Sequence, residues 1–372
     1  MSDFMKFFRI YFIPGIIFQS VLIGGGYGTG REVVQYFGRF GAGGLWGLLV
    51  TFIFFAIILF LSFEFARIMR AYDYRSWIKG MLGPVWPLYD ILYFFMAILV
   101  IAVITAAAAN ILEEQLGISF FIAAVFVIIV VGILMFFGRS LIEGYKSIIT
   151  LVLYITFIGL FITVLANRGP DISATIALGI VEPGWARSGF IYAMYNLVCI
   201  VPVLWFCDVF ETRKQAFVSS IIAALLAIIP ALFTLLSMLA FYPDIVPVAV
   251  PWVYAMGALG VAGLMYVYFV ALGATLIETS TGMVIGFVQR INGHLDELGK
   301  PQLTPQQRAI GSVIVLIAAM LLAQFGLIGL VARGYTAMGY GFLILHALPV
   351  ATIGLYKIIK HQATDSKSTI NQ

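Results

Sequence analysis

The chain has 372 residues, of which 62% are hydrophobic and only 10% are charged, and its mean hydropathy is +1.07. Soluble globular domains average about 45–50% apolar and about 25% charged residues, so this composition excludes a water-soluble protein and indicates an integral membrane protein. The net charge of +4 is small, and the placement of the charges is more informative than their sum.

Apolar runs close to the ~20 residues that an α-helix needs to cross a bilayer recur along the whole chain. No long polar segment separates them, so we expect an all-α polytopic membrane protein with about ten spanning helices. The predicted spans are 8–23 (continuing to about 40), 44–66, 89–112, 119–137, 145–166, 188–210, 216–241, 257–288, 309–325 and 335–357.

Lysine and arginine are distributed unevenly between the two ends of these spans. With the N-terminus placed in the cytoplasm, five of the 21 fall outside, and these are Arg31, Arg39, Arg168, Arg187 and Arg333. Because cytoplasmic loops retain positive residues, we expect a multi-pass protein of the bacterial inner or plasma membrane with both termini in the cytoplasm. The polar segment 359–372 is predicted to be a disordered cytoplasmic tail.

The stretch IGGGYGTGRE at residues 23–32 places five glycines within seven residues in the middle of the first apolar segment. Each glycine in a helix interior costs about 1 kcal/mol relative to alanine. Non-helical backbone survives at membrane depth only where protein or a watery cavity encloses it. We therefore favour two half-helices joined by an unwound hinge whose free backbone groups hold a ligand. The alternative is that the glycines let a neighbouring helix approach closely.

The sixth segment carries Asn196 and Pro202 inside apolar sequence, and proline removes a backbone hydrogen bond. Interrupted segments in matching places of two halves are typical of the binding site of an inverted-repeat transporter. The two predicted five-helix repeats are residues 1–170 and 186–358. The alternative for this segment is an ordinary proline kink.

The stretch IGGGYGTGREVVQYFGRFGAGGLWG resembles the first-helix signature of amino acid, polyamine and organocation transporters with the LeuT fold. Gly26 and Gly28 match its break, and Gly41, Gly43 and Gly44 match the glycine-rich turn that follows. Within that superfamily the chain is most similar to the YkvI-like bacterial membrane proteins. The resemblance implies two intertwined five-helix inverted repeats with discontinuous helices 1 and 6. It also implies alternating access, a solute held between the two breaks, and often an ion between helices 1 and 8.

The same resemblance assigns residues to the solute site. Arg31 is similar to the arginine that closes the outer gate in sodium-coupled members, and its alternative is a plain interfacial charge. Tyr27 either stacks over a solute or packs in the core. The residues expected at the solute are Gly24, Gly25, Gly26, Tyr27, Gly28, Thr29, Tyr195, Asn196 and Ser280.

Helix eight is expected to take part in ion coupling, with Thr275, Glu278 and Thr279. Thr275 falls where sodium-coupled relatives place a hydroxyl, but Leu276 stands where the second hydroxyl belongs, so the chain departs from the standard sodium site. A carboxylate inside the membrane is costly and should face the interior, which makes Glu278 a candidate for proton coupling. Lys146 of helix five either pairs with Glu278 or extends to the cytoplasmic surface. The coupling ion, H⁺ or Na⁺, stays open.

If Glu278 couples proton movement to transport, its replacement by glutamine should abolish gradient-driven accumulation and leave solute exchange intact. Accumulation that is unchanged in Glu278→Gln would exclude that role.

Other chemistry is not indicated. The three histidines, His294, His346 and His361, are far apart and lack the spacing of a metal site, so we expect no metal, no cofactor, no enzymatic activity and no nucleic-acid partner. The prediction is a cation-coupled secondary active transporter of a small polar solute, an amino acid or related zwitterion, in contact with the lipid bilayer. An ion channel and a non-transporting solute sensor are the alternatives. Oligomeric state is left open.

Overall fold

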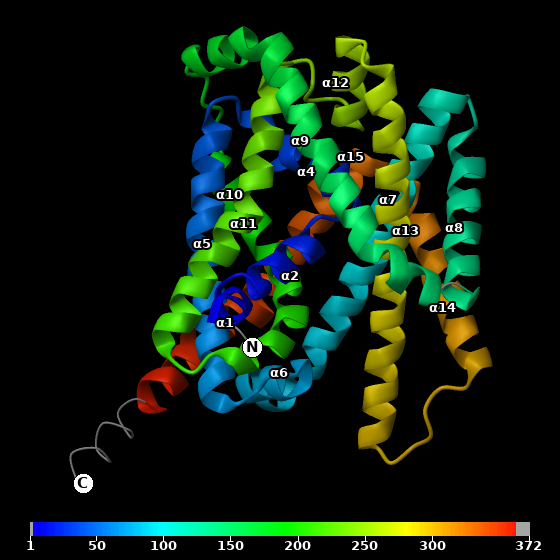
Figure 1. The fold of residues 1–372 in the computed structure, drawn as a ribbon. Coiled ribbons are helices and arrows are strands. Elements are labelled where there is room, and N and C mark those ends of the chain that lie inside the picture. Colours follow the sequence, from blue (N-terminus) through cyan, green and yellow to red (C-terminus); the bar gives the residue numbers. More distant parts are fainter. Residues whose placement is uncertain (1–2, 138, 362–372) are drawn as a thin grey trace.

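The computed structural model describes residues 3–137 and 139–361. The side chains of most residues between 131 and 153, and those of Ile277, Glu278 and Thr281, lie outside the described ones. In the described residues the chain is helical apart from short connections, and one isolated bridge joins Gly41 to Val181 (Figure 1). The predicted all-α class is confirmed.

The first apolar segment is divided into short helices and is not one rod. Pro14 lies in the first turn of α2, where its missing N–H costs nothing. The helices are α1 (Asp3–Tyr11), α2 (Ile13–Leu22), α3 (Gly25–Gly28) and α4 (Arg31–Tyr36), followed by a short 3-10 turn, η1 (Gly38–Phe40). The expected discontinuity of the first helix is confirmed.

Long apolar helices make up the rest of the first half. Before α6, the Asp73 carboxylate accepts hydrogen bonds from the N–H groups of Arg75 and Ser76, both at 2.9 Å, and caps that helix. In α9 the backbone leaves helical geometry at Arg168, close before Pro170, and the helix turns there. The elements are α5 (Gly43–Met69), α6 (Tyr74–Leu82), η2 (Gly83–Val85), α7 (Pro87–Leu116), α8 (Phe120–Phe137) and α9 (Arg139–Ala177).

The second half opens with α10 (Trp185–Tyr195), which continues directly as a 3-10 helix, η3 (Asn196–Val209). The sixth segment thus changes helix type at Asn196, where the sequence predicted an interruption, and no unwound residue separates the two parts. Two of the later helices, α11 and α14, begin with capping boxes at Thr212 and Thr304. The other elements are α11 (Arg213–Leu239), α12 (Pro251–Leu259), α13 (Ala262–Glu297), α14 (Pro305–Ala323), α15 (Leu327–Gly329), η4 (Leu330–Tyr335), α16 (Thr336–Phe342), η5 (Leu343–Ala347) and η6 (Val350–Gly354).

Two predicted boundaries were wrong. The eighth span begins at Ala262 and not at 257, because Gly260, with a φ of +67°, ends α12 and separates it from α13. The last span begins at Leu327 and not at 335, so Arg333 lies within a helix that includes the π-helical turns η4, η5 and η6.

Among the described residues, eight helices are long and apolar enough to cross a membrane. Two shorter apolar stretches, Phe120–Val130 of α8 and Ala262–Leu276 of α13, join them. The pattern supports a polytopic membrane protein, while the number of ten spans stays a prediction.

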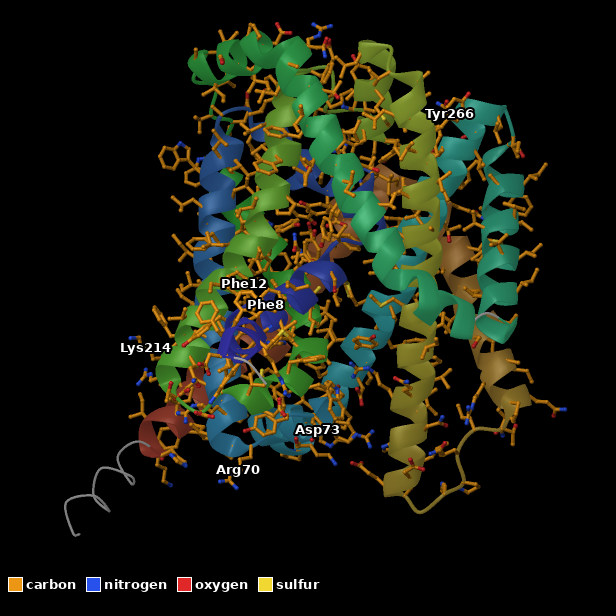
Figure 2. The ribbon with its side chains drawn as sticks, viewed as in Figure 1. Phe8, Phe12, Arg70, Asp73, Lys214 and Tyr266 are labelled. Carbon is orange, nitrogen blue, oxygen red and sulfur yellow. The ribbon has the colours of Figure 1, made fainter. Side chains whose placement is uncertain are left out.

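The bundle has two distinguishable ends. Figure 2 places Arg70, Asp73 and Lys214 toward one end, together with α6, and Tyr266 at the opposite end near α12. We call the first the basic end and the second the outer end, because positive residues are expected to face the cytoplasm.

Glycine lets the central helices approach closely. A Cβ on Gly189 of α10 would lie 2.2 Å from the Gly47 carbonyl oxygen of α5, and the Thr51 hydroxyl donates to the Gly189 carbonyl oxygen at 2.9 Å. A Cβ on Gly15 of α2 would lie 2.8 Å from the Ala223 Cα of α11. Close packing of small residues thus holds the first and sixth segments against their neighbours.

Candidate functional site

The break in the first segment lies at Ile23 and Gly24, between α2 and α3. There the Gly24 N–H donates to the Leu22 carbonyl oxygen at 2.9 Å, which is not a helical hydrogen bond. A second interruption follows at Thr29 and Gly30, where Gly30 has a φ of +81° that favours glycine over any other residue. The chain through residues 20–34 is therefore unwound twice.

The sequence left two roles open for the glycines, an unwound hinge and close approach of a neighbouring helix, and the structure shows both. A Cβ on Gly26 would lie 2.3 Å from Oε1 of Glu32, and one on Gly28 would lie 2.7 Å from Cδ1 of Leu272 in α13. The glycines thus permit the unwound backbone and also let a carboxylate and a neighbouring helix pack directly onto it.

Several carbonyl groups of the break are already hydrogen bonded. The Thr29 hydroxyl donates to the Gly26 carbonyl oxygen at 2.8 Å, and the Tyr268 hydroxyl of α13 donates to that of Gly28 at 3.0 Å. The backbone N–H of Trp252 donates to the Thr29 carbonyl oxygen at 3.2 Å. Two side chains and a backbone amide at the start of α12 thus satisfy carbonyl groups that a continuous helix would satisfy itself.

The sixth segment reaches the break through Tyr195, the last residue of α10. Its hydroxyl donates to Oε2 of Glu32 at 2.7 Å. The neighbouring Asn196 begins the 3-10 helix, and its amide donates to the Tyr192 carbonyl oxygen at 3.0 Å, within its own segment. Of the two predicted residues of helix six, Tyr195 therefore hydrogen bonds the first segment, whereas the Asn196 amide bonds within its own segment.

Glu32 is a site residue that the sequence reading missed. It follows the break, is only 4% exposed, and lies among the rings of Tyr36, Tyr192 and Tyr195. The available signal was a carboxylate inside an apolar run expected to continue to residue 40. Such a residue is costly in a membrane and is usually functional.

Arg31 is buried at the outer end and does not sit at an interface. Its guanidinium donates to the carbonyl oxygens of Val246 and Val248, each at 2.8 Å, and to Oε1 of Gln35 at 2.9 Å. The side chain is 1% exposed, so the alternative of an interfacial charge was wrong. Arg31 fastens the loop between α11 and α12 over the second interruption.

The other predicted residues are placed as follows. Tyr27 is fully buried in the core, and the Ser280 hydroxyl is buried without a hydrogen-bond partner among the described residues. The Thr275 hydroxyl donates to Ala271 within α13 at 2.9 Å, whereas a Cβ on Gly24 would lie 3.9 Å from the Thr279 methyl group. Thr279 thus lies at Gly24, while Tyr268 and Leu272 of the same helix contact the break at Gly28. The side chains of Glu278 and Lys146 lie outside the described residues.

A cavity of about 580 Å³ opens between the first segment, α6, α7, η3 and α13. Its lining includes Val21, just before the break, and Val198, just after Tyr195 and Asn196. Toward the basic end it is lined by Arg75, Arg290 and Gly293. Solvent from that end can thus approach the level of the two breaks.

Ion pairs border this cavity. The Arg290 guanidinium binds Asp90 of α7 at 2.7 Å and lies over the rings of Tyr74 and Tyr93, at 3.8 and 3.5 Å from their centroids. At the end of α13, Glu297 pairs with Lys79 at 2.7 Å and with Arg75 at 3.0 Å. These contacts join α6 and α7 to α13.

The Glu297 pairs should make a small, pH-dependent contribution to stability. The hydrogen bond from Lys79, with the charge of Arg75, lowers the pKa of Glu297 below its ordinary value. Because the folded-state pKa lies below the ordinary value, the ion pairs stabilise the folded protein at every pH above the ordinary pKa of glutamate. This stabilisation is lost as the pH falls through the folded-state pKa. We expect Glu297→Gln to cost about 0.5 kcal/mol or less at neutral pH, because the group is exposed. Thermal unfolding of both proteins across pH should show the difference vanishing in acid; a difference that grows in acid would contradict the pairing.

The all-helical bundle, in which an unwound first segment meets the sixth segment at its change of helix type, has the LeuT-like fold. In agreement with this, the chain superposes on a Na⁺-coupled sialic acid symporter solved in a substrate-bound outward-open state, with a TM-score of 0.62. Sequence identity is 14%, and the match covers 92% of this chain and 79% of that one. A manganese transporter of Eremococcus coleocola gives a TM-score of 0.49 at 16% identity, covering 97% of this chain and 88% of that one.

In sequence, the chain is similar to the uncharacterized membrane protein YkvI of Bacillus subtilis (strain 168), to which it is 27% identical over 136 residues. That match covers 36% of this chain and 37% of the relative, so it spans little more than a third of either. No family model matches the chain.

Proposed function

We propose that this protein is a secondary active transporter that moves a small polar solute across the membrane by alternating access. The observation that carries the proposal is the meeting of the unwound first segment with the sixth segment at its change of helix type, where Tyr195 of α10 bonds Glu32 directly beside the glycines. Paired interruptions at the same depth are the arrangement in which such transporters bind their solutes.

One-sided access supports the same proposal. At the outer end, Arg31 holds the loop between α11 and α12 over the break, and the backbone N–H of Trp252, at the start of α12, bonds Thr29 of the break itself. At the basic end, the 580 Å³ cavity extends to Val21 and Val198. A transporter in a state open to one side has one open and one closed path to its solute site, whereas a conducting channel needs a continuous path across the membrane.

The solute is proposed to be an amino acid or a related zwitterion. The amide groups that begin a helix favour a carboxylate, and the carbonyl groups that end one favour an amine. Both occur where α2 ends and α3 begins. Coupling to a cation is part of the proposal, with Thr275, Thr279 and Glu278 of α13 as candidates alongside the break. The likeness to a Na⁺-coupled symporter favours testing Na⁺ beside H⁺.

The experiment is uptake by the purified protein in liposomes, under imposed proton and sodium gradients applied separately. The panel should contain amino acids of each charge class, betaine and sialic acid. Saturable, gradient-driven accumulation and counterflow of one solute would support the proposal. Ion currents that do not saturate would indicate a channel, and solute binding without flux would indicate a sensor; either result would overturn it.

A further inference from the structure

Glu32 is held against the break by contacts on both carboxylate oxygens. Oε2 accepts the hydrogen bond from Tyr195, and the backbone of Tyr27 provides a second hydrogen bond to the carboxyl group. A Cβ built on Gly26 would lie 2.3 Å from Oε1, so the carboxylate packs directly against the glycine backbone. The group joins α4 to α3 and to α10.

This carboxylate has no positive partner in the part of the chain that the structure describes. The adjacent Arg31 directs its guanidinium to Val246, Val248 and Gln35 instead. The titratable groups facing Glu32 from α3, α4, α10, η3 and η4 are Tyr27, Tyr36, Tyr192, Tyr195, Cys199 and Tyr335. Tyrosine and cysteine side chains are ordinarily neutral near pH 7, so none of them balances a negative charge.

A buried carboxylate without a counter-charge takes up either a proton or another cation. Gly26 and Tyr195 pack closely on its two oxygens, so little space is left beside them for a metal cation. A proton needs no cavity of its own and therefore fits this carboxylate. The Tyr195 hydroxyl suits both states, since it donates to a carboxylate and accepts from a carboxylic acid.

We propose that Glu32 is the group that binds and releases the coupling proton during transport. The proposal rests on the proposed transport function and names its coupling ion. In the state open to the outer end, the Glu32 carboxylate accepts a proton from that side. In the state open to the basic end, the carboxylic acid loses the same proton to water in the cavity that reaches Val21 and Val198. One proton crosses per cycle, and no other group is oxidised or reduced.

The position of Glu32 links this proton to the gate. Arg31, the preceding residue of α4, fastens the outer loop, and Tyr36 of the same helix donates to the Val331 carbonyl oxygen of the last span at 3.0 Å. A change of charge at Glu32 therefore acts on the helix that is bonded both to the loop between α11 and α12 and to the last span.

Glu32→Gln tests the proposal, because glutamine keeps the size of the side chain and imitates the protonated state. With the solute panel above, we expect counterflow to persist and proton-driven accumulation to fall to simple equilibration, without uptake of protons reported by a pH dye inside the liposomes. The control is Glu297→Gln at the exposed end of α13, which should accumulate solute as the unsubstituted protein does. Accumulation by Glu32→Gln equal to that of the unsubstituted protein would overturn the proposal. Accumulation by the unsubstituted protein that needs sodium and moves no proton would overturn it too.

An infrared titration reads the same group without any solute. As the pH rises, the unsubstituted protein should lose a carboxylic acid C=O band that is missing from Glu32→Gln and present in Glu297→Gln. If no solute on the panel is transported, the proposed function fails, while this titration still decides whether Glu32 exchanges a proton. Absence of a band that depends on Glu32 would overturn the proton site.

Discussion

Replacing Gly189 by alanine is expected to destabilise the protein more than any other single methyl addition discussed here. The new Cβ would lie 2.2 Å from the Gly47 carbonyl oxygen and 3.1 Å from its Cα, and both belong to backbone that no rotamer change can move. Overpacking of a core costs about 1–3 kcal/mol where side chains can adjust, and we expect the upper part of that range or more here. Thermal unfolding in detergent, followed by size-exclusion chromatography, measures the loss.

The matched control is Gly311→Ala in α14. No heavy atom lies within 4 Å of a Cβ built there, and the residue is helical, so alanine should be neutral or add up to about 1 kcal/mol through helix propensity. If Gly189→Ala unfolds at the same temperature as Gly311→Ala, the contact between α10 and α5 is not present in the folded protein.

Replacing Arg31 by alanine is expected to open the outer end. The change leaves the carbonyl oxygens of Val246 and Val248 and the amide oxygen of Gln35 without their donor. An unsatisfied buried group costs about 1–3 kcal/mol, and the loop can avoid this cost by moving into water. A shift of about 1.4 kcal/mol changes the ratio of open to closed molecules tenfold.

Labelling of a cysteine under the loop measures that opening. Met238 is buried beside Gly30, so Met238→Cys reports access to the second interruption once Cys199 and Cys207 are replaced by alanine. We expect an impermeant maleimide to react about tenfold faster, or more, when Arg31 is also alanine. Arg187→Ala is the control, because that guanidinium is exposed and bonds Tyr340 away from the loop. Equal rates for both variants would exclude Arg31 as a closure of the outer end.

The sequence predicted the break in the first segment through its glycines, and it marked Asn196 as the place where the sixth segment departs from α-helical geometry. Glycine cannot sustain a helix at the density found in residues 24–30, and this cost is local, so it can be recognised without a structure. Tyr195 was named through the resemblance to LeuT-fold transporters, which places it facing the break. The roles of the other predicted solute residues stay predictions.

Glu32 and the partners of Arg31 could not be predicted in the same way. Arg31 and Glu32 are neighbours in sequence and read as one charged pair at a helix end. In the folded protein one side chain reaches the loop at Val246 and Val248, and the other reaches Tyr195. Those partners are 163 or more residues away along the chain, and no local pattern encodes such distances.

The sequence by itself determined the membrane environment, the helical class and the places where helices are interrupted, because hydropathy and helix propensity are sums over neighbouring residues. Only the tertiary structure decided that Arg31 bonds the loop between α11 and α12, where the last span begins, and that a carboxylate lies against the broken backbone without a positive partner among the described residues. These features depend on which helices pack together, and close approach between backbones such as Gly189 and Gly47 sets that packing.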